Sequence, residues 1–309
     1  GCSALLADGF ITPPISISSA IEGLNIIYPK LPTIPIVLTI LFLLFIFQQF
    51  GTSIIGKTFG PIMFLWFTVI GILGLIKVIE YPFIFSALNP YYAFQLLFNH
   101  PGGFWILGAV FLCTTGAEAL YADLGKKKKK NIQLSWIYVF CCLILNYMGQ
   151  SIWCLQHDGQ LLNDVSPFYA LIPSAYLTYF ILLATAATII ASQALISGCF
   201  TLISEAIKQR LWINLKVNYP ADSKGQVYIP AINWVLFIGC ILIIIIFKKS
   251  ANMEAAYGLT ITIDMIMTSA LLLLFFKKRN WPVFFFLFLG IIFFSIYFTF
   301  LLSNLNKFF

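Results

Sequence analysis

Long apolar runs separated by short polar connections dominate this sequence. Nine of them approach or exceed the ~20 mostly apolar residues that a helix needs to cross a bilayer. Their predicted ranges are 2–24, 35–51, 60–80, 104–122, 133–152, 174–203, 229–247, 255–276 and 282–302. We expect Gly60-Pro61 to open the third run and Pro230 the seventh, because proline costs little at a helix start. The pattern predicts an all-α membrane protein with about nine transmembrane helices.

Composition supports the same class of protein. Of the 309 residues, 61% are hydrophobic and 9% are charged, which excludes an ordinary soluble domain. We expect residues 1–309 to form one transmembrane domain. The sequence starts with the apolar stretch GCSALLADG and no methionine, so we also expect it to be truncated at its N-terminus. The seven cysteines lie mostly in apolar runs and form no CxxC pair, which favours small buried side chains over metal ligands or disulfides.

Basic residues are distributed unevenly between the connections. One alternating set of connections holds thirteen of them, including Lys126–Lys130, and the opposite set holds four. The positive-inside rule places the first set in the cytoplasm, so the first span runs from inside to outside. The lysine run itself is interpreted as a solvated loop and not as a nucleic-acid site. Lys77 and Glu80 sit at a span end, where we expect a structural role.

Polar residues within the first span form a stripe. Asp8, Thr12, Ser16 and Ser19 are spaced four, four and three residues apart, which places them on one helix face. Pro13 and Pro14 remove two backbone donors and free carbonyl groups one turn earlier. Hydroxyl groups alone would fit a kinked helix bonded to its neighbours. With the carboxylate of Asp8 on the same stripe, the pattern favours a pathway for a cation bound by oxygen atoms.

Two further spans carry acids at membrane depth. In the fourth span, Thr115 and Glu118 are three residues apart on one face. In the eighth span, Tyr257 and Asp264 share a face, and Gly258 is expected to allow a local break in the helix. We expect each of these acids to have a functional role, because a charge in the bilayer centre costs several kcal/mol. Such acids bind cations, or carry protons when burial favours their neutral form.

Signals for catalysis are poor. The two histidines, His100 and His157, fall in connections between predicted spans, and the sequence contains no HExxH, GxSxG or Walker motif. We therefore expect neither an enzyme nor a bound cofactor.

Six motifs in order along the chain resemble the KUP/HAK/KT family of potassium uptake transporters. They are DGFITPPISISSAIEGL, FQQFGTSIIGKTFGPIMFLWF, GAEALYADLG, NYMGQ, ASQALISG and NMEAAYGL, and together they cover nearly the whole chain. The resemblance implies the amino acid–polyamine–cation transporter fold, which is LeuT-like and has two inverted five-helix repeats. It also implies proton-coupled potassium import.

The resemblance assigns roles to individual residues. It implies a potassium site formed by Asp8, Thr12, Ser16, Thr115, Glu118 and Tyr257. The candidates for proton coupling are Asp8, Glu22, Glu118 and Asp264, with Asp8 and Glu118 leading. Relative to the family pattern, the first two spans and the C-terminal cytoplasmic region are absent. Asp264 stands where the family has a small polar or apolar residue.

The resulting hypothesis is a fragment of a potassium importer of the bacterial inner membrane. Its partners would be the potassium ion, the proton and the lipid bilayer, with a homodimer left open and no nucleic acid. Two alternatives remain at this stage. One is a carrier of the same fold for another solute, such as an amino acid, and the other is a membrane remnant that transports nothing.

Overall fold

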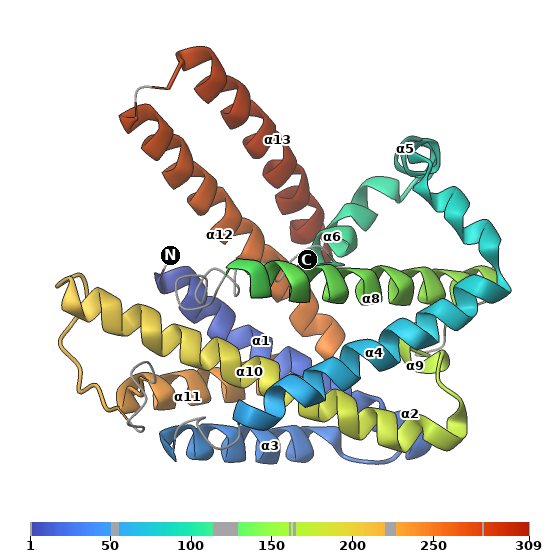
Figure 1. The fold of residues 1–309 in the computed structure, drawn as a ribbon, viewed down its shortest axis with the longest axis horizontal. Coiled ribbons are helices and arrows are strands. Elements are labelled where there is room, and N and C mark those ends of the chain that lie inside the picture. The colour runs from blue at the N-terminus through green and yellow to red at the C-terminus, as the bar shows by residue number, and fades with distance from the viewer. Residues whose placement is uncertain are drawn as a thin grey trace.

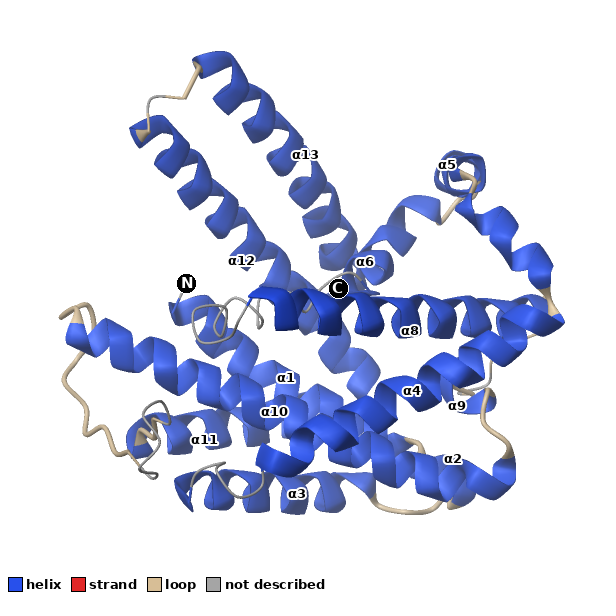
Figure 2. Ribbon diagram, in the orientation of Figure 1, coloured by secondary structure: helices blue, strands red, loops and turns tan. Residues whose placement is uncertain are grey.

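The computed structural model of the protein describes residues 2–50, 56–113, 129–160, 162, 165–219, 227–279 and 281–308. Within these ranges the regular structure is helical, apart from one isolated antiparallel bridge between Asn218 and Tyr228 (Figures 1 and 2). The long helices are α1 (Cys2–Glu22), α3 (Thr33–Phe47), α4 (Gly56–Glu80), α8 (Lys129–Gln156), α10 (Leu177–Lys208), α11 (Pro230–Phe247), α12 (Ser250–Lys278) and α13 (Val283–Phe308). Shorter helices are α2 (Leu24–Ile27), α5 (Pro90–Asn99), α6 (Gly103–Cys113) and α9 (Pro167–Ala170), with 3₁₀ turns at Gln48–Phe50, Pro82–Leu88 and Ser174–Tyr176.

Eight of the nine predicted spans correspond to described helices that are long and apolar enough to cross a membrane. The remaining span, 104–122, is represented by the apolar helix α6, and its second half lies outside the described residues. The protein is therefore an all-α, multi-pass membrane protein. The sixth predicted span corresponds to α10, whose 32 residues make it about 48 Å long, against a hydrocarbon core of ~30 Å.

One expected boundary is wrong. Gly60-Pro61 does not open the third span, since α4 already begins at Gly56 and contains Pro61 in its second turn. Pro61 removes the backbone donor for the carbonyl four residues earlier, a loss limited to one bond near the helix start. Pro230, in contrast, does open α11 as predicted.

Helix α1 lies in the middle of the molecule and packs against α3, α10, α11 and α12 (Figure 1). The largest cluster of buried side chains joins α1, α3, α10, α11 and α12, and includes the fully buried Ile17, Leu41, Phe200, Leu236 and Met253. Helices α4 and α8 form a second closely packed pair, while α12 and α13 form a hairpin that projects away from the rest (Figure 1). The residue stripe predicted on α1 is thus carried by a central helix.

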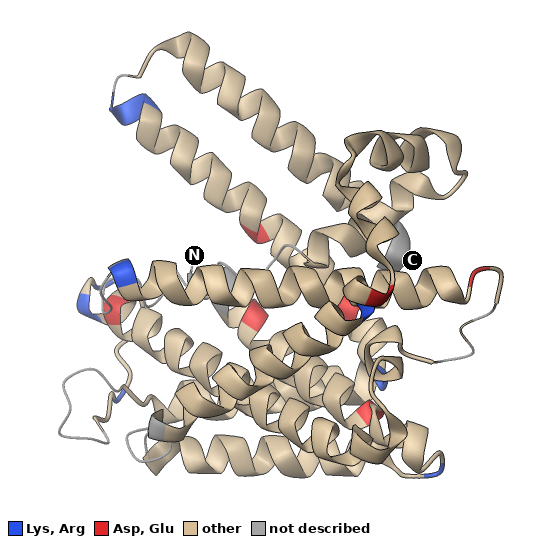
Figure 3. Cartoon of the chain, turned by 45° about the vertical axis from the view of Figure 1, so that its right-hand side comes forward, with Lys and Arg blue, Asp and Glu red and all other residues tan. Residues whose placement is uncertain are grey.

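The helices alternate in direction, which gathers many of the basic residues at one end. Helices α1, α4, α8 and α11 run one way in Figure 1, and α3 and α10 run the other way. Lys130 near the start of α8 and Lys208 at the end of α10 consequently lie on the same side, where Figure 3 shows several of the blue segments. That this side faces the cytoplasm stays a prediction. At the end of α4, Lys77 and Glu80 form an ion pair of 2.7 Å, in agreement with their expected structural role.

Candidate functional site

The polar stripe on α1 is present as predicted. Asp8 is buried, with 5% of its surface exposed, and the hydroxyl of Thr12 donates a hydrogen bond to its carboxylate. Ser16 follows one turn later and is half-buried, whereas Ser19 is exposed. A buried carboxylate beside a row of hydroxyl groups offers hard oxygen ligands, the kind that a dehydrated cation needs. This is the strongest local feature that favours a cation.

The two prolines of α1 do not interrupt the helix. The helix runs without a break from Cys2 to Glu22, through Pro13 and Pro14. Pro13 deprives the carbonyl of Gly9 of its helical donor, and the thiol of Cys240 on α11 takes that place with an S···O distance of 3.6 Å. A freed carbonyl next to Asp8 is therefore bonded to a neighbouring helix and serves packing, so it is not simply one more open oxygen ligand.

The side of α1 at Gly9 is closed by two other helices. A Cβ atom on Gly9 would lie 3.1 Å from Sγ of Cys199 on α10 and 3.1 Å from Cδ2 of Leu236 on α11. Both residues are buried. Contact with a glycine lets these helices approach the backbone of α1 closely, and this holds the turn that carries Asp8 in place.

Tyr257 and Asp264 lie on α12, which packs against α1. Both side chains are half-buried, and Oδ1 of Asp264 is buried without a hydrogen-bond donor among the described residues. The expected break at Gly258 is wrong, because α12 is continuous from Ser250 to Lys278. The glycine instead makes room for Asn304 on α13, whose Oδ1 would lie 2.4 Å from a Cβ at this position.

Two residues of α13, Ser303 and Asn304, connect α6 to α12. The backbone N–H of Gly108 on α6 donates to Oγ of Ser303 at 2.8 Å, and this hydroxyl donates to the carbonyl of Trp105 at 2.8 Å. Nδ2 of Asn304, which is fully buried, lies 3.3 Å from Oγ1 of Thr262 on α12. The sequence interpretation missed both residues. Their signal was an adjacent Ser-Asn pair in an apolar helix, but the predicted end of the last span at residue 302 placed them outside it.

Thr115 and Glu118 lie outside the described residues. Helix α6 ends at Cys113, directly before them, and packs against α12 and α13. Of the other predicted ion ligands, the structure joins Asp8 to Thr12 by a hydrogen bond and places Ser16 on the same helix and Tyr257 on a helix packed against it. Glu22 stands apart from them at the end of α1, where it accepts a hydrogen bond of 2.8 Å from the backbone N–H of Ser250.

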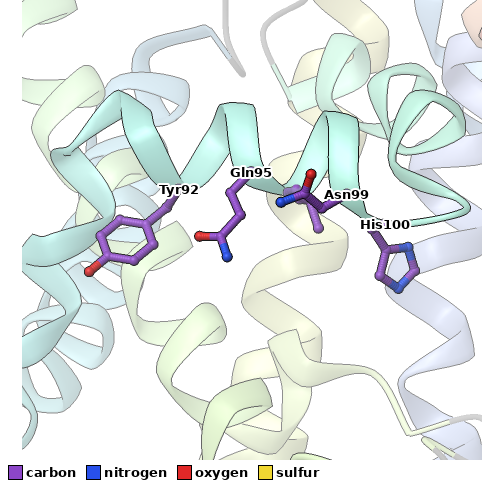
Figure 4. Close-up of a pocket in the computed structure, with 5 residues that line it drawn as sticks. Tyr92, Gln95, Asn99 and His100 are labelled. Carbon is purple, nitrogen blue, oxygen red and sulfur yellow. The ribbon is translucent and has the colours of Figure 1, made fainter.

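A separate pocket of about 340 Å³ lies along α5, a helix that carries none of the predicted ion ligands. Figure 4 shows Tyr92, Gln95, Asn99 and His100 side by side on this helix, and Leu96 completes the lining. The pocket is lined by this short segment alone, without a carboxylate, and all of its lining residues are exposed. A dehydrated cation needs charged or convergent oxygen ligands, so the stripe on α1 is the better candidate site.

Comparisons with known proteins identify the family of the chain. Residues 1–309 match the profile of a family described as the K+ potassium transporter integral membrane domain. The chain is 51% identical over 316 residues to a probable potassium transport system protein Kup of Flavobacterium johnsoniae, and this covers all of the chain and 48% of the relative. Similar proteins of the same description from Cytophaga hutchinsonii and Clostridium perfringens are each 49% identical, again over the whole chain and 48% and 49% of their lengths. The chain thus spans about half the length of the curated relatives that it matches.

Proposed function

Because the chain belongs to the family of K+ potassium transporter integral membrane domains, we propose that it is part of a protein that imports potassium across a bacterial inner membrane. The transported ions would be potassium and the proton, without a further cofactor. The relatives are named for potassium transport, and the chain has the multi-pass architecture that such transport needs. The amino acid–polyamine–cation fold and a homodimer are part of the same proposal for the full-length protein.

The observation that carries this proposal is the buried carboxylate of Asp8 on the central helix. A carboxylate buried at membrane depth is costly, and a cation bound beside it would offset part of that cost. The hydroxyl of Thr12 points its proton at Asp8, so its oxygen lone pairs remain available to an ion held beside the carboxylate. Ser16 would extend the same row of oxygen atoms by one turn.

The remaining ligands would come from other helices. In the proposed site, Thr115 and Glu118 contribute oxygen atoms from the segment that follows α6, and Tyr257 contributes its hydroxyl from α12. Asp8, Glu118 and Asp264 are the candidates for carrying the proton, because an acid at membrane depth can alternate between a charged and a neutral form. Import would follow when the helices around the ion rearrange and open it to the cytoplasm.

The test is growth of a bacterium that lacks its own potassium uptake systems and expresses the full-length protein. We expect wild-type protein to restore growth at low potassium, and Asp8→Asn to lower the initial uptake rate at least tenfold. The matched control is Asp158→Asn, the same change at an exposed acid in a connection, which should leave uptake unchanged. Two results would contradict the proposal. One is growth of the Asp8→Asn variant at the wild-type rate, and the other is growth that responds to an added amino acid in place of potassium.

A further inference from the structure

The start of α12 is capped by a residue of another helix. Its preceding residue, Lys249, makes no capping hydrogen bond with its side chain, and Lys248 turns the chain with a positive φ of 60°. The first backbone N–H groups of a helix need acceptors from outside the helix. Glu22, the last residue of α1, supplies one. Its Oε1 accepts the N–H of Ser250 at 2.8 Å and its Oε2 accepts the hydroxyl of the same serine.

A residue of α9 also contacts this end of α1. The hydroxyl of Tyr169 on α9 lies 3.1 Å from each of the carbonyl oxygens of Ser19 and Ala20. Its ring covers Gly23, where a Cβ would fall 2.6 Å from Cζ of Tyr169. Burial, followed by the negative charge of Glu22, raises the pKa of the Tyr169 hydroxyl, so this group stays protonated and donates. The end of α1 is therefore fixed while it caps α12.

This contact sets the relative level of two helices that carry predicted ion ligands. Glu22 is the last residue of α1 and Ser250 is the first residue of α12. The two helices pack against each other in antiparallel orientation, with this contact at one end of the pair. Ser16 and Thr12 lie about 9 and 15 Å along α1 from Glu22, at 1.5 Å per residue. Tyr257 lies about 10 Å along α12 from Ser250 by the same rise. The cap therefore brings Tyr257 to the level between Ser16 and Thr12.

We infer that Glu22 is a positioning residue, which fixes Tyr257 against the stripe of α1 by capping α12, and that it does not carry the transported proton. The inference rests on the proposed function. Both carboxylate oxygens of Glu22 are engaged by Ser250, and a proton on Oε2 would displace the hydroxyl proton of this serine. A group whose bonds hold two helices together is poorly suited to gain and lose a proton in every transport cycle.

The experiment compares two substitutions of Glu22 in the full-length protein. Glu22→Gln keeps an oxygen acceptor for the N–H of Ser250, so we expect the KM for potassium, the maximal rate and the pH profile of uptake to stay within twofold of wild type. Glu22→Ala removes the cap, and we expect the KM for potassium to rise about fivefold, the fold-change expected when the typical free energy of a lost helix cap is expressed in ion binding. The control is Glu80→Ala, which removes an exposed acid at the end of α4.

A double-substitution cycle tests whether the effect passes through Ser250. Ser250→Ala keeps the backbone bond, so it should raise the KM less than Glu22→Ala, and the double variant should be no worse than Glu22→Ala alone. Loss of potassium uptake or a shifted pH profile in Glu22→Gln would overturn the inference, as would an unchanged KM in Glu22→Ala. If wild-type protein imports no potassium, the proposed function fails. The cap is then tested by thermal unfolding. Glu22→Ala should lower the unfolding midpoint relative to wild type, and Glu22→Gln should not. Equal midpoints for the two variants would overturn the role of the cap.

Discussion

Replacement of Gly74 by alanine should separate α4 from α8. A Cβ on Gly74 would lie 2.2 Å from the carbonyl oxygen of Leu145 and 2.3 Å from its carbonyl carbon. From the other side, a Cβ on Gly149 would lie 2.8 Å from Cα of Gly74. These neighbours are backbone atoms, which cannot rotate away as a side chain would. Because non-bonded carbon atoms approach to about 3.5 Å, the helices must move apart by roughly 1 Å.

The expected cost follows from this displacement. Overpacking a well-packed interface costs typically ~1–3 kcal/mol, and here the movement also loosens the contacts of neighbouring side chains along the pair. Alanine recovers at most ~1 kcal/mol through its higher helix propensity. A net loss of about 2 kcal/mol lowers the unfolding midpoint by about 3 °C when 309 residues unfold as one unit. None of the predicted ion ligands lies on α4 or α8, so the KM for potassium should change little.

The assay is thermal unfolding of the purified full-length protein in detergent, with uptake measured in parallel. Gly290→Ala is the matched control, because it makes the same change within a long apolar helix, where the new Cβ would meet only a side-chain atom of Leu273 at 3.4 Å. This variant should unfold at or slightly above the wild-type midpoint. If Gly74→Ala is as stable as Gly290→Ala, the backbone contact does not limit the approach of the two helices, and the reasoning is refuted.

Three further substitutions test the surroundings of the candidate site. Gly258→Ala should lower initial potassium uptake severalfold, because its Cβ would fall 2.4 Å from Oδ1 of Asn304 and shift α12, and the added change Asn304→Ala should restore part of the rate. Cys240→Ala should lower the unfolding midpoint by about 2 °C through the lost bond to Gly9, worth ~1 kcal/mol, whereas Cys240→Ser keeps a donor and should not. Thr12→Val should raise the KM for potassium about tenfold, since bonds to charged groups contribute ~1.5–3 kcal/mol, while Thr12→Ser should stay close to wild type. These expectations are contradicted by an unchanged uptake rate in Gly258→Ala, an unchanged unfolding midpoint in Cys240→Ala, or an unchanged KM for potassium in Thr12→Val.

Length and composition were sufficient to find the membrane helices. An apolar stretch of about 20 residues in this context has few structures available other than a helix, because its backbone groups must bond within the segment. The boundaries were less secure where proline was used as the only marker. Helix α4 accommodates Pro61 in its second turn, and the sequence alone does not distinguish that position from the helix start.

The candidate site was predictable as far as it depends on a single helix. Asp8 and Thr12 are four residues apart, and that spacing alone brings their side chains together on α1. The bond from Cys240 to Gly9 and the cap of Ser250 by Glu22 join residues more than 200 positions apart. Such contacts depend on which helices become neighbours, and a spacing pattern contains no information about that.

The described contacts join the helices around the proposed site through α1 and α12, which pack against each other. On one side of this pair, α1 packs against α3, α10 and α11, with a shared cluster of buried side chains and the bond between Cys240 and Gly9. On the other side, α12 packs against α6 and α13, and Ser303 and Asn304 connect these three helices. The stripe of α1 and Tyr257 of α12 therefore lie on two helices that share a packed interface. A movement that opens the proposed site must either loosen this interface or carry the two helices together.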